Sequence, residues 1–242
     1  MPDLAKIFLD FLFPPSCLLC RKQGDFICPA CKKSLGFLTR QVCPYCAKPS
    51  LTGQVHEACR KGYFLDGLVS AFSYHSPFKK IIAQIKFEPY LFSALGELTV
   101  NAIAYLDSDD RFLPFRDFIR KSDPVVVPIP LHKSKLRQRG FNQAQIIGKK
   151  VASYYGLALE KKLLLRGRST KPQFKLDERE RWRNIKGAFL IDEARLGNCP
   201  ASRLPSVLLV DDIWTTGATM KEATRVLKRA GIPKVWGLTL AQ

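Results

Sequence analysis

Val207-Leu208-Leu209-Val210-Asp211-Asp212-Ile213-Trp214-Thr215-Thr216-Gly217-Ala218-Thr219 is the stretch of sequence that decides the fold. Its first four residues are aliphatic, which predicts a short strand that is buried on both faces and ends in two adjacent carboxylates. A turn of hydroxyl residues and glycine follows, and a helical pattern begins near Met220. A strand, a turn and a helix in this order indicate an α/β protein with a mostly parallel sheet.

The polar residues after this strand have the chemistry of a site for a phosphorylated sugar. Five residues would lie at a helix N-terminus, where unpaired N–H groups and the helix dipole favour an anion: Thr215, Thr216, Gly217, Ala218 and Thr219. Asp211 and Asp212 would accept hydrogen bonds from ribose hydroxyls or help to hold Mg²⁺. An ordinary turn with a threonine N-cap is the alternative. The glycines and the lysine of Walker A and dinucleotide-binding motifs are absent.

The chain is strongly basic. It has 242 residues, with 39 Lys and Arg against 21 Asp and Glu, and a formal net charge of +18. This charge favours polyanionic partners: nucleic acid, phosphorylated metabolites or an anionic membrane. Between residues 133 and 186 the basic residues outnumber the acidic ones about four to one. The sequence has no run of about 18 apolar residues, so no membrane span is predicted. The short amphipathic segment 4–13 is expected to pack against the core or to dock on another surface.

Cysteines dominate the first sixty residues. Seven of the eight lie between Cys17 and Cys59, in three C-x-x-C pairs and one H-x-x-C pair. Two such pairs complete a tetrahedral zinc site, and a site closed by four protein ligands is structural. We expect one site from Cys17, Cys20, Cys28 and Cys31, and a second from Cys43, Cys46, His56 and Cys59. An interleaved pairing, first pair with third, is left open, and a disulfide framework is the competing interpretation.

The rest of the chain alternates between strand and helix patterns. We expect strands within 64–73, 125–130, 163–166, 207–210 and 235–240, and helices over 77–87, 93–106, 142–155 and from 220. The segment 107–123 is polar at its start, and a loop is expected there. Residues 167–186 are rich in charge and poor in apolar residues, which suggests a mobile flap over a ligand.

A basic turn follows the strand near residue 127. Several donors converge there, which suits pyrophosphate, and Arg139 and Asn142 are the best candidates. For Lys133, Lys135 and Arg137 a solvated basic loop is an equal alternative. These three residues, with Arg179 and Arg183, are the candidates for DNA binding.

Three features now coincide: the cysteine pairs, Arg139-Gly140-Phe141-Asn142-Gln143 and the acid-pair segment. The acid-pair segment resembles the phosphoribosyl-pyrophosphate (PRPP) loop of type I phosphoribosyltransferases. Nearly the entire chain, Lys86-Phe87 included, resembles the ComF family, also called ComFC/GntX-like. The resemblance implies a double zinc-ribbon module over residues 1–63 and a type I phosphoribosyltransferase-like domain over 64–242, with helices on both faces of the sheet. His56 departs from the family, which usually has a cysteine there.

The resemblance implies a cytoplasmic protein that supports natural transformation by handling incoming single-stranded DNA beside a helicase-like partner. The expected ligands are structural Zn²⁺, in one or two sites, and PRPP with Mg²⁺. Contact with the inner face of the membrane is an additional expectation. Two functions stay open. One is DNA handling by a protein with a PRPP-binding pocket, and the other is an active Mg²⁺-dependent phosphoribosyltransferase that acts on an unknown nucleobase-like acceptor, with Asp211 and Asp212 as catalytic residues.

Overall fold

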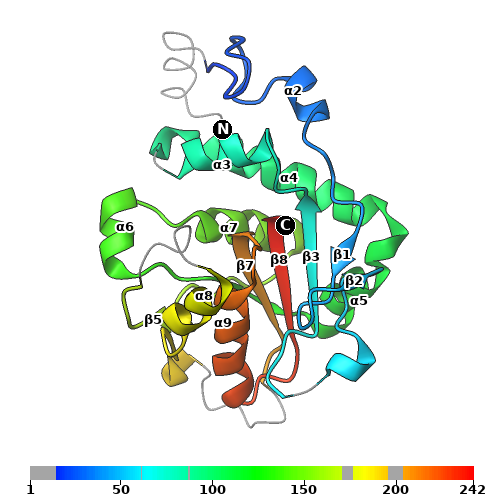
Figure 1. The fold of residues 1–242 in the computed structure, drawn as a ribbon, viewed down its shortest axis with the longest axis vertical. Helices are drawn as coiled ribbons and strands as arrows, with labels where there is room; N and C mark the ends of the chain where they lie inside the picture. Colours follow the sequence, from blue (N-terminus) through cyan, green and yellow to red (C-terminus); the bar gives the residue numbers. More distant parts are fainter. Residues whose placement is uncertain (1–14, 61, 87, 171–176, 196–203) are drawn as a thin grey trace.

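Four parallel strands form the central sheet, as predicted (Figure 1). Their order is β3 (Gly67–Phe72), β8 (Val235–Ala241), β7 (Val207–Ile213) and β4 (Val125–Pro128). The computed structural model describes residues 15–60, 62–86, 88–170, 177–195 and 204–242. The amphipathic segment 4–13, Phe87 and Cys199 lie outside these ranges.

The side chains of β7 alternate between two hydrophobic cores. Leu208 and Val210 face the core under α4 (Phe92–Ser108) and α7 (Gln143–Tyr155), whereas Leu209 faces the core under α9 (Ala218–Arg229). A strand that is buried on both faces needs apolar residues at every position. The prediction of helices on both faces of a mostly parallel sheet is therefore confirmed.

The remaining elements lie around this sheet. They are α2 (Pro29–Lys33), β1 (Gln41–Val42), β2 (Pro49–Ser50), α3 (Phe78–Ile85), α5 (Leu113–Ser122), α6 (Lys133–Arg139), β5 (Leu164–Arg166), α8 (Glu178–Ile185) and β6 (Phe189–Ile191). Short 3₁₀ turns cover Glu57–Cys59, Pro89–Leu91, Asp110–Phe112 and Glu193–Arg195. Among the described residues, no helix has both the length and the apolar composition needed to cross a membrane.

The structure corrects one predicted turn and adds a helix that was not predicted. In the segment 107–123, expected to be loop-like at its start, α5 forms from Leu113 onward, because Phe115, Phe118 and Ile119 give it one buried face. The basic turn is the helix α6, which begins at the N-cap His132 and ends at Gly140 in the left-handed conformation. Both helices are short and rich in charge, so their patterns are weak in the sequence.

Two strand predictions also change. Strand β7 runs on to Ile213, so the acid pair lies within the strand and does not follow it. Strand β5 pairs antiparallel with β6 and forms a separate two-stranded sheet. Within the predicted flap, residues 177–186 include the helix α8, which starts at a capping box between Asp177 and Glu180. Residues 171–176 of that prediction lie outside the described ranges.

The second half of the cysteine-rich segment covers the free edge of β3. The buried Gln41 side chain pairs with the backbone of Ser70, donating to its carbonyl and accepting from its N–H, both at 2.9 Å. Gly53 accepts from the Leu68 N–H at 2.8 Å, and a Cβ on Gly53 would lie 2.0 Å from the Leu68 carbonyl oxygen. The edge strand therefore has partners along its length.

The first half of the segment packs on α3 and α4. Leu18, Ile27 and Leu35 belong to the same hydrophobic core as the buried face of α3. The Gln84 side chain of α3 donates to the Leu18 carbonyl at 3.1 Å. The cysteine-rich segment and the sheet are thus joined through a common core.

We predict that Gln41→Leu lowers the free energy of unfolding by about 1–3 kcal/mol, because both backbone groups of Ser70 lose a buried partner. Urea denaturation of the zinc-loaded protein measures this change. The neighbouring Arg40→Ala, at an exposed position, serves as the control and should change stability by no more than about 0.5 kcal/mol. Equal stability of the Gln41→Leu variant and the wild type would contradict this account of the sheet edge.

Candidate functional site

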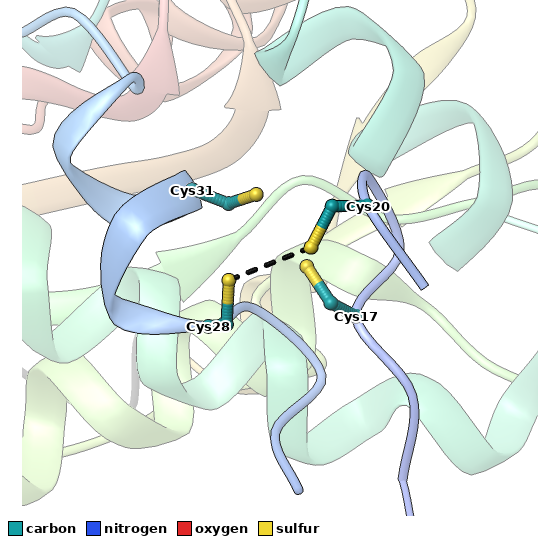
Figure 2. Close-up of side chains that lie close together, drawn as sticks. All are labelled: Cys17, Cys20, Cys28 and Cys31. Carbon is teal, nitrogen blue, oxygen red and sulfur yellow. Dashed lines mark hydrogen bonds between the residues drawn. The ribbon is translucent and has the colours of Figure 1, made fainter. Parts of the chain in front are cut away.

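Four cysteines at the start of the chain converge on one point (Figure 2). Cys17 and Cys20 come from a tight turn, while Cys28 is the N-cap of α2 and Cys31 lies within it. The four Sγ atoms all lie within 4.8 Å of one another, and those of Cys20 and Cys28 are 3.6 Å apart. The arrangement matches the first site expected from the sequence.

The second cluster joins Cys43, Cys46, His56 and Cys59, whose ligand atoms again lie within 4.8 Å of one another. The His56 Nδ1 atom is 3.5 Å from the Cys46 Sγ, and the Nε2 atom is 3.0 Å from the Pro49 carbonyl oxygen. Donation from Nε2 to this carbonyl leaves Nδ1 unprotonated and ready to ligate a metal.

Both clusters fit structural zinc. Each offers four soft or borderline ligands in a closed set, which is the donor chemistry of zinc ribbons. The consecutive pairing is the one that forms, so the interleaved alternative is wrong. The seven cysteines in the described part of the chain are free thiols, against the disulfide interpretation.

A cleft of about 360 Å³ lies at the carboxyl end of β7. Most of the acid-pair segment lines it. The lining residues are Tyr74, Lys79, Lys86, Arg181, Asp211, Asp212, Ile213, Trp214, Thr215, Gly217, Ala218, Thr219 and Met220. The structure thus brings together the predicted residues of this segment, apart from Thr216, in one cavity with three cations from distant elements.

The two carboxylates of the cleft differ in their surroundings. Asp211 accepts a hydrogen bond from the Asp212 N–H at 2.9 Å, whereas the Asp212 carboxylate pairs with the Lys86 ammonium at 3.3 Å. Burial and the adjacent Asp212 charge raise the pKa of Asp211 well above its usual value. A perturbed acid in a cleft is typical of a functional site.

The turn after the acid pair approaches its surroundings closely. Gly217 has a φ of +71°, and a Cβ there would lie 2.2 Å from the Trp214 ring, so only glycine fits. The Thr216 hydroxyl oxygen is buried and has no hydrogen-bond partner among the described residues. Thr216 does not line the cleft, so the N-terminus of α9 meets the cleft through Thr215, Gly217, Ala218 and Thr219.

Helix α8 adds a cation to this turn. The Arg181 guanidinium lies 3.4 Å from the Thr215 hydroxyl. Glu222 of α9 is almost fully buried, pairs with Arg225 and accepts the Gly187 N–H at 2.7 Å just after α8. These bonds hold α8 on α9 and keep Arg181 beside the cleft.

Sequence reasoning missed Lys79, Lys86 and Arg181 as lining residues. Lys86 was noted only as part of the resemblance to the ComF family. Its place in the cleft could not be predicted, because no pattern in the sequence shows that α3 lies over the end of β7. The seven-residue spacing of Lys79 and Lys86, which puts them on one side of a helix, is the signal that could have pointed to them.

The other predicted site residues lie outside the lining of this cleft. Asn142 is buried, accepts the Ala144 N–H at 3.1 Å and donates to the Ile129 carbonyl at 2.9 Å. It therefore caps α7, and its contact with pyrophosphate stays a prediction. Arg139 is the last residue of α6. Burial, together with the positive charges of Arg166 and Arg139, lowers the pKa of the half-buried Lys135.

The candidates for DNA binding lie on two helices. Lys133 and Arg137 are exposed on α6, and Arg179 and Arg183 are exposed on α8. Lys135 is half-buried. The structure provides the helices for these residues, and their role in DNA binding stays a prediction.

Comparison with known proteins identifies the cysteine-rich segment and relatives of nearly the whole chain. Residues 8–60 match the family described as the double zinc ribbon domain. The chain is 30% identical to the DNA utilization protein YhgH of Salmonella typhi over 240 residues, covering 93% of this chain and 96% of the relative.

The chain belongs to the ComF family. It is also 26% identical to competence protein F of Haemophilus influenzae, over 93% of this chain and 96% of the relative. Competence protein ComFC of Bacillus subtilis is 26% identical, over 87% of this chain and 81% of the relative. The similarity to these ComF proteins extends through the sheet and the cleft, well beyond the zinc ribbons.

We predict that His56→Ala lowers the zinc content from two ions to about one per chain after a mild chelator challenge, because the second cluster loses a ligand. Elemental analysis of the purified protein measures the content. His56→Cys should keep both ions, as should His75→Ala at an exposed position away from the clusters. Two retained ions in the His56→Ala variant would remove His56 from the ligand set.

Proposed function

We propose that this ComF-family protein supports natural transformation by handling incoming single-stranded DNA, and that its cleft binds PRPP with Mg²⁺. The names of the relatives, which are competence and DNA utilization proteins, support the first part. The chemistry of the cleft supports the second. We further propose that residues 1–63 act as the zinc-ribbon module and residues 64–242 as the phosphoribosyltransferase-like domain.

One observation carries the PRPP proposal: an acid pair and a helix N-terminus meet in a single cleft at the carboxyl end of a parallel strand. Ligands of open α/β sheets bind outside this end of the strands. In the proposal, the turn 215–219 binds the 5′-phosphate, and Asp211 and Asp212 receive the ribose hydroxyls. Carboxylate oxygens are also the ligands that Mg²⁺ prefers, so the residues present fit this ion.

The basic surface supports the DNA proposal. The chain carries a net charge of +18, and α6 and α8 both carry exposed cations. In Figure 1 the two helices lie on the same side of the sheet, to its left. Polyanions bind to such surfaces through their phosphates, largely without regard to sequence. In this proposal the protein lies in the cytoplasm, in contact with a helicase-like partner, and touches the inner face of the membrane.

Turnover of PRPP is the second candidate function, and the raised pKa of Asp211 favours it. A carboxyl group with a raised pKa takes up a proton more readily and could exchange it with an acceptor, while Asp212 stabilises positive charge at the sugar carbon. Release of pyrophosphate in the presence of a nucleobase would distinguish turnover from binding alone.

We predict that the double variant Asp211→Asn/Asp212→Asn loses PRPP binding in the presence of Mg²⁺ while its affinity for single-stranded DNA is unchanged. The amides keep the shape of the side chains but remove the charge that holds the cation. Calorimetric titration with PRPP measures the first effect and fluorescence anisotropy the second. Unchanged PRPP affinity would overturn the assignment of the cleft.

We predict that the double variant Lys133→Glu/Arg137→Glu binds single-stranded DNA more weakly than the wild type and with a flatter salt dependence. The slope of log K against log salt should become smaller by about 0.7 for each DNA phosphate that the variant no longer neutralises. Anisotropy titrations at several salt concentrations measure the slope. Lys161→Glu/Lys162→Glu makes the same charge change at exposed positions outside α6 and α8 and is the matched control. Equal slopes in both variants would place the DNA surface elsewhere.

A further inference from the structure

Helix α3 turns a basic edge toward the cleft. Lys79 and Lys86 both line the cavity, and their spacing of seven residues brings them to the same side of the helix. The neighbouring apolar face, made of Phe78, Ile81, Ile82 and Ile85, is buried in the core. Because this face is held by packing, the basic edge cannot rotate away from the cleft.

Lys86 has a carboxylate partner inside the cleft. Its ammonium lies 3.3 Å from the Asp212 Oδ2 atom, and the two side chains are 27% and 15% exposed. A lysine ammonium beside a carboxylate neutralises its charge, as a bound divalent cation would. A flexible stem of four carbons lets the same ammonium reach a second partner nearby.

We propose that Lys86 stands in for the divalent cation at Asp212 in the ligand-free protein and moves onto a phosphate group of the sugar ligand when ligand and Mg²⁺ bind. The inference rests on the proposed PRPP-binding function of the cleft. In the free state the ammonium neutralises Asp212, and in the bound state Mg²⁺ does so while the ammonium pairs with phosphate. A partly buried charge without a partner is costly, and neither state contains one.

This exchange has two opposite consequences for affinity. A cation that arrives alone must displace Lys86 and leave the ammonium without a partner, so free Mg²⁺ or Mn²⁺ binds weakly. A cation that arrives with a phosphorylated sugar provides the ammonium with a new partner. Lys86 thus opposes binding of the bare metal and favours binding of the metal with its ligand.

The test is Lys86→Met, which keeps the stem and removes the charge, in the full-length, zinc-loaded protein. We expect its affinity for PRPP with Mg²⁺ to fall at least about tenfold, because the variant cannot form the charge-assisted hydrogen bond to phosphate. Its affinity for Mn²⁺ alone should rise severalfold, because Asp212 is left without its counter-charge. Calorimetry measures the first quantity and the electron paramagnetic resonance signal of free Mn²⁺ the second.

Three further variants sharpen the test. Lys86→Gln is a second neutral variant that should behave as Lys86→Met does, and Lys86→Arg keeps the charge and should bind Mn²⁺ alone as weakly as the wild type. Lys80→Met removes an exposed lysine from another side of α3 and should change neither affinity. Thermal unfolding and zinc content confirm that each variant is folded.

The PRPP and Mn²⁺ affinities test two separate parts of the proposal. An unchanged PRPP affinity in both neutral variants overturns the phosphate contact, and an unchanged Mn²⁺ affinity overturns the role of Lys86 as a stand-in for the cation. If the wild type itself binds no PRPP, the proposed function of the cleft fails, and the phosphate contact fails with it. The Mn²⁺ measurement still reports whether Lys86 shields Asp212.

Discussion

The position of β7 in the sheet is the constraint on which the rest of the structure depends. Its backbone pairs with β8 on one side and β4 on the other, and its side chains are buried on both faces. A strand held in four directions cannot shift its register without exposing one core. The acid pair therefore stays at the carboxyl end of the sheet, and the turn into α9 brings backbone amides to the same place.

The cleft is an arrangement of balanced charges. Asp212 has the Lys86 ammonium beside it, while burial and the charge of Asp212 keep the pKa of Asp211 high. Cations from α3 and α8 face the turn after β7 from separate parts of the chain. The ligand that we propose, which carries phosphates, hydroxyls and a divalent cation, would be complementary to these carboxylates and cations.

The zinc ribbons and the cleft share a structural support. Leu18 and Ile27 of the first ribbon pack in the same core as Ile81 of α3, and Gln84 ties the helix to the ribbon backbone. Small zinc modules draw much of their folding free energy from the metal, about 10 kcal/mol or more. The metal thus helps to hold the helix that carries Lys86 over the acid pair.

The sequence by itself determined the strands and helices whose patterns are long or apolar, and the identity of the zinc ligands. It determined these because the spacing of ligands and the apolar run of β7 are local properties of the chain. Tertiary structure alone decided the pairing of the cysteine knuckles, the helical state of the charged segments α5 and α6, and the detachment of β5 from the main sheet. It also decided that Lys86 and Arg181 meet Asp212 and Thr215, because contacts between residues so distant in the chain depend on how helices pack across the sheet.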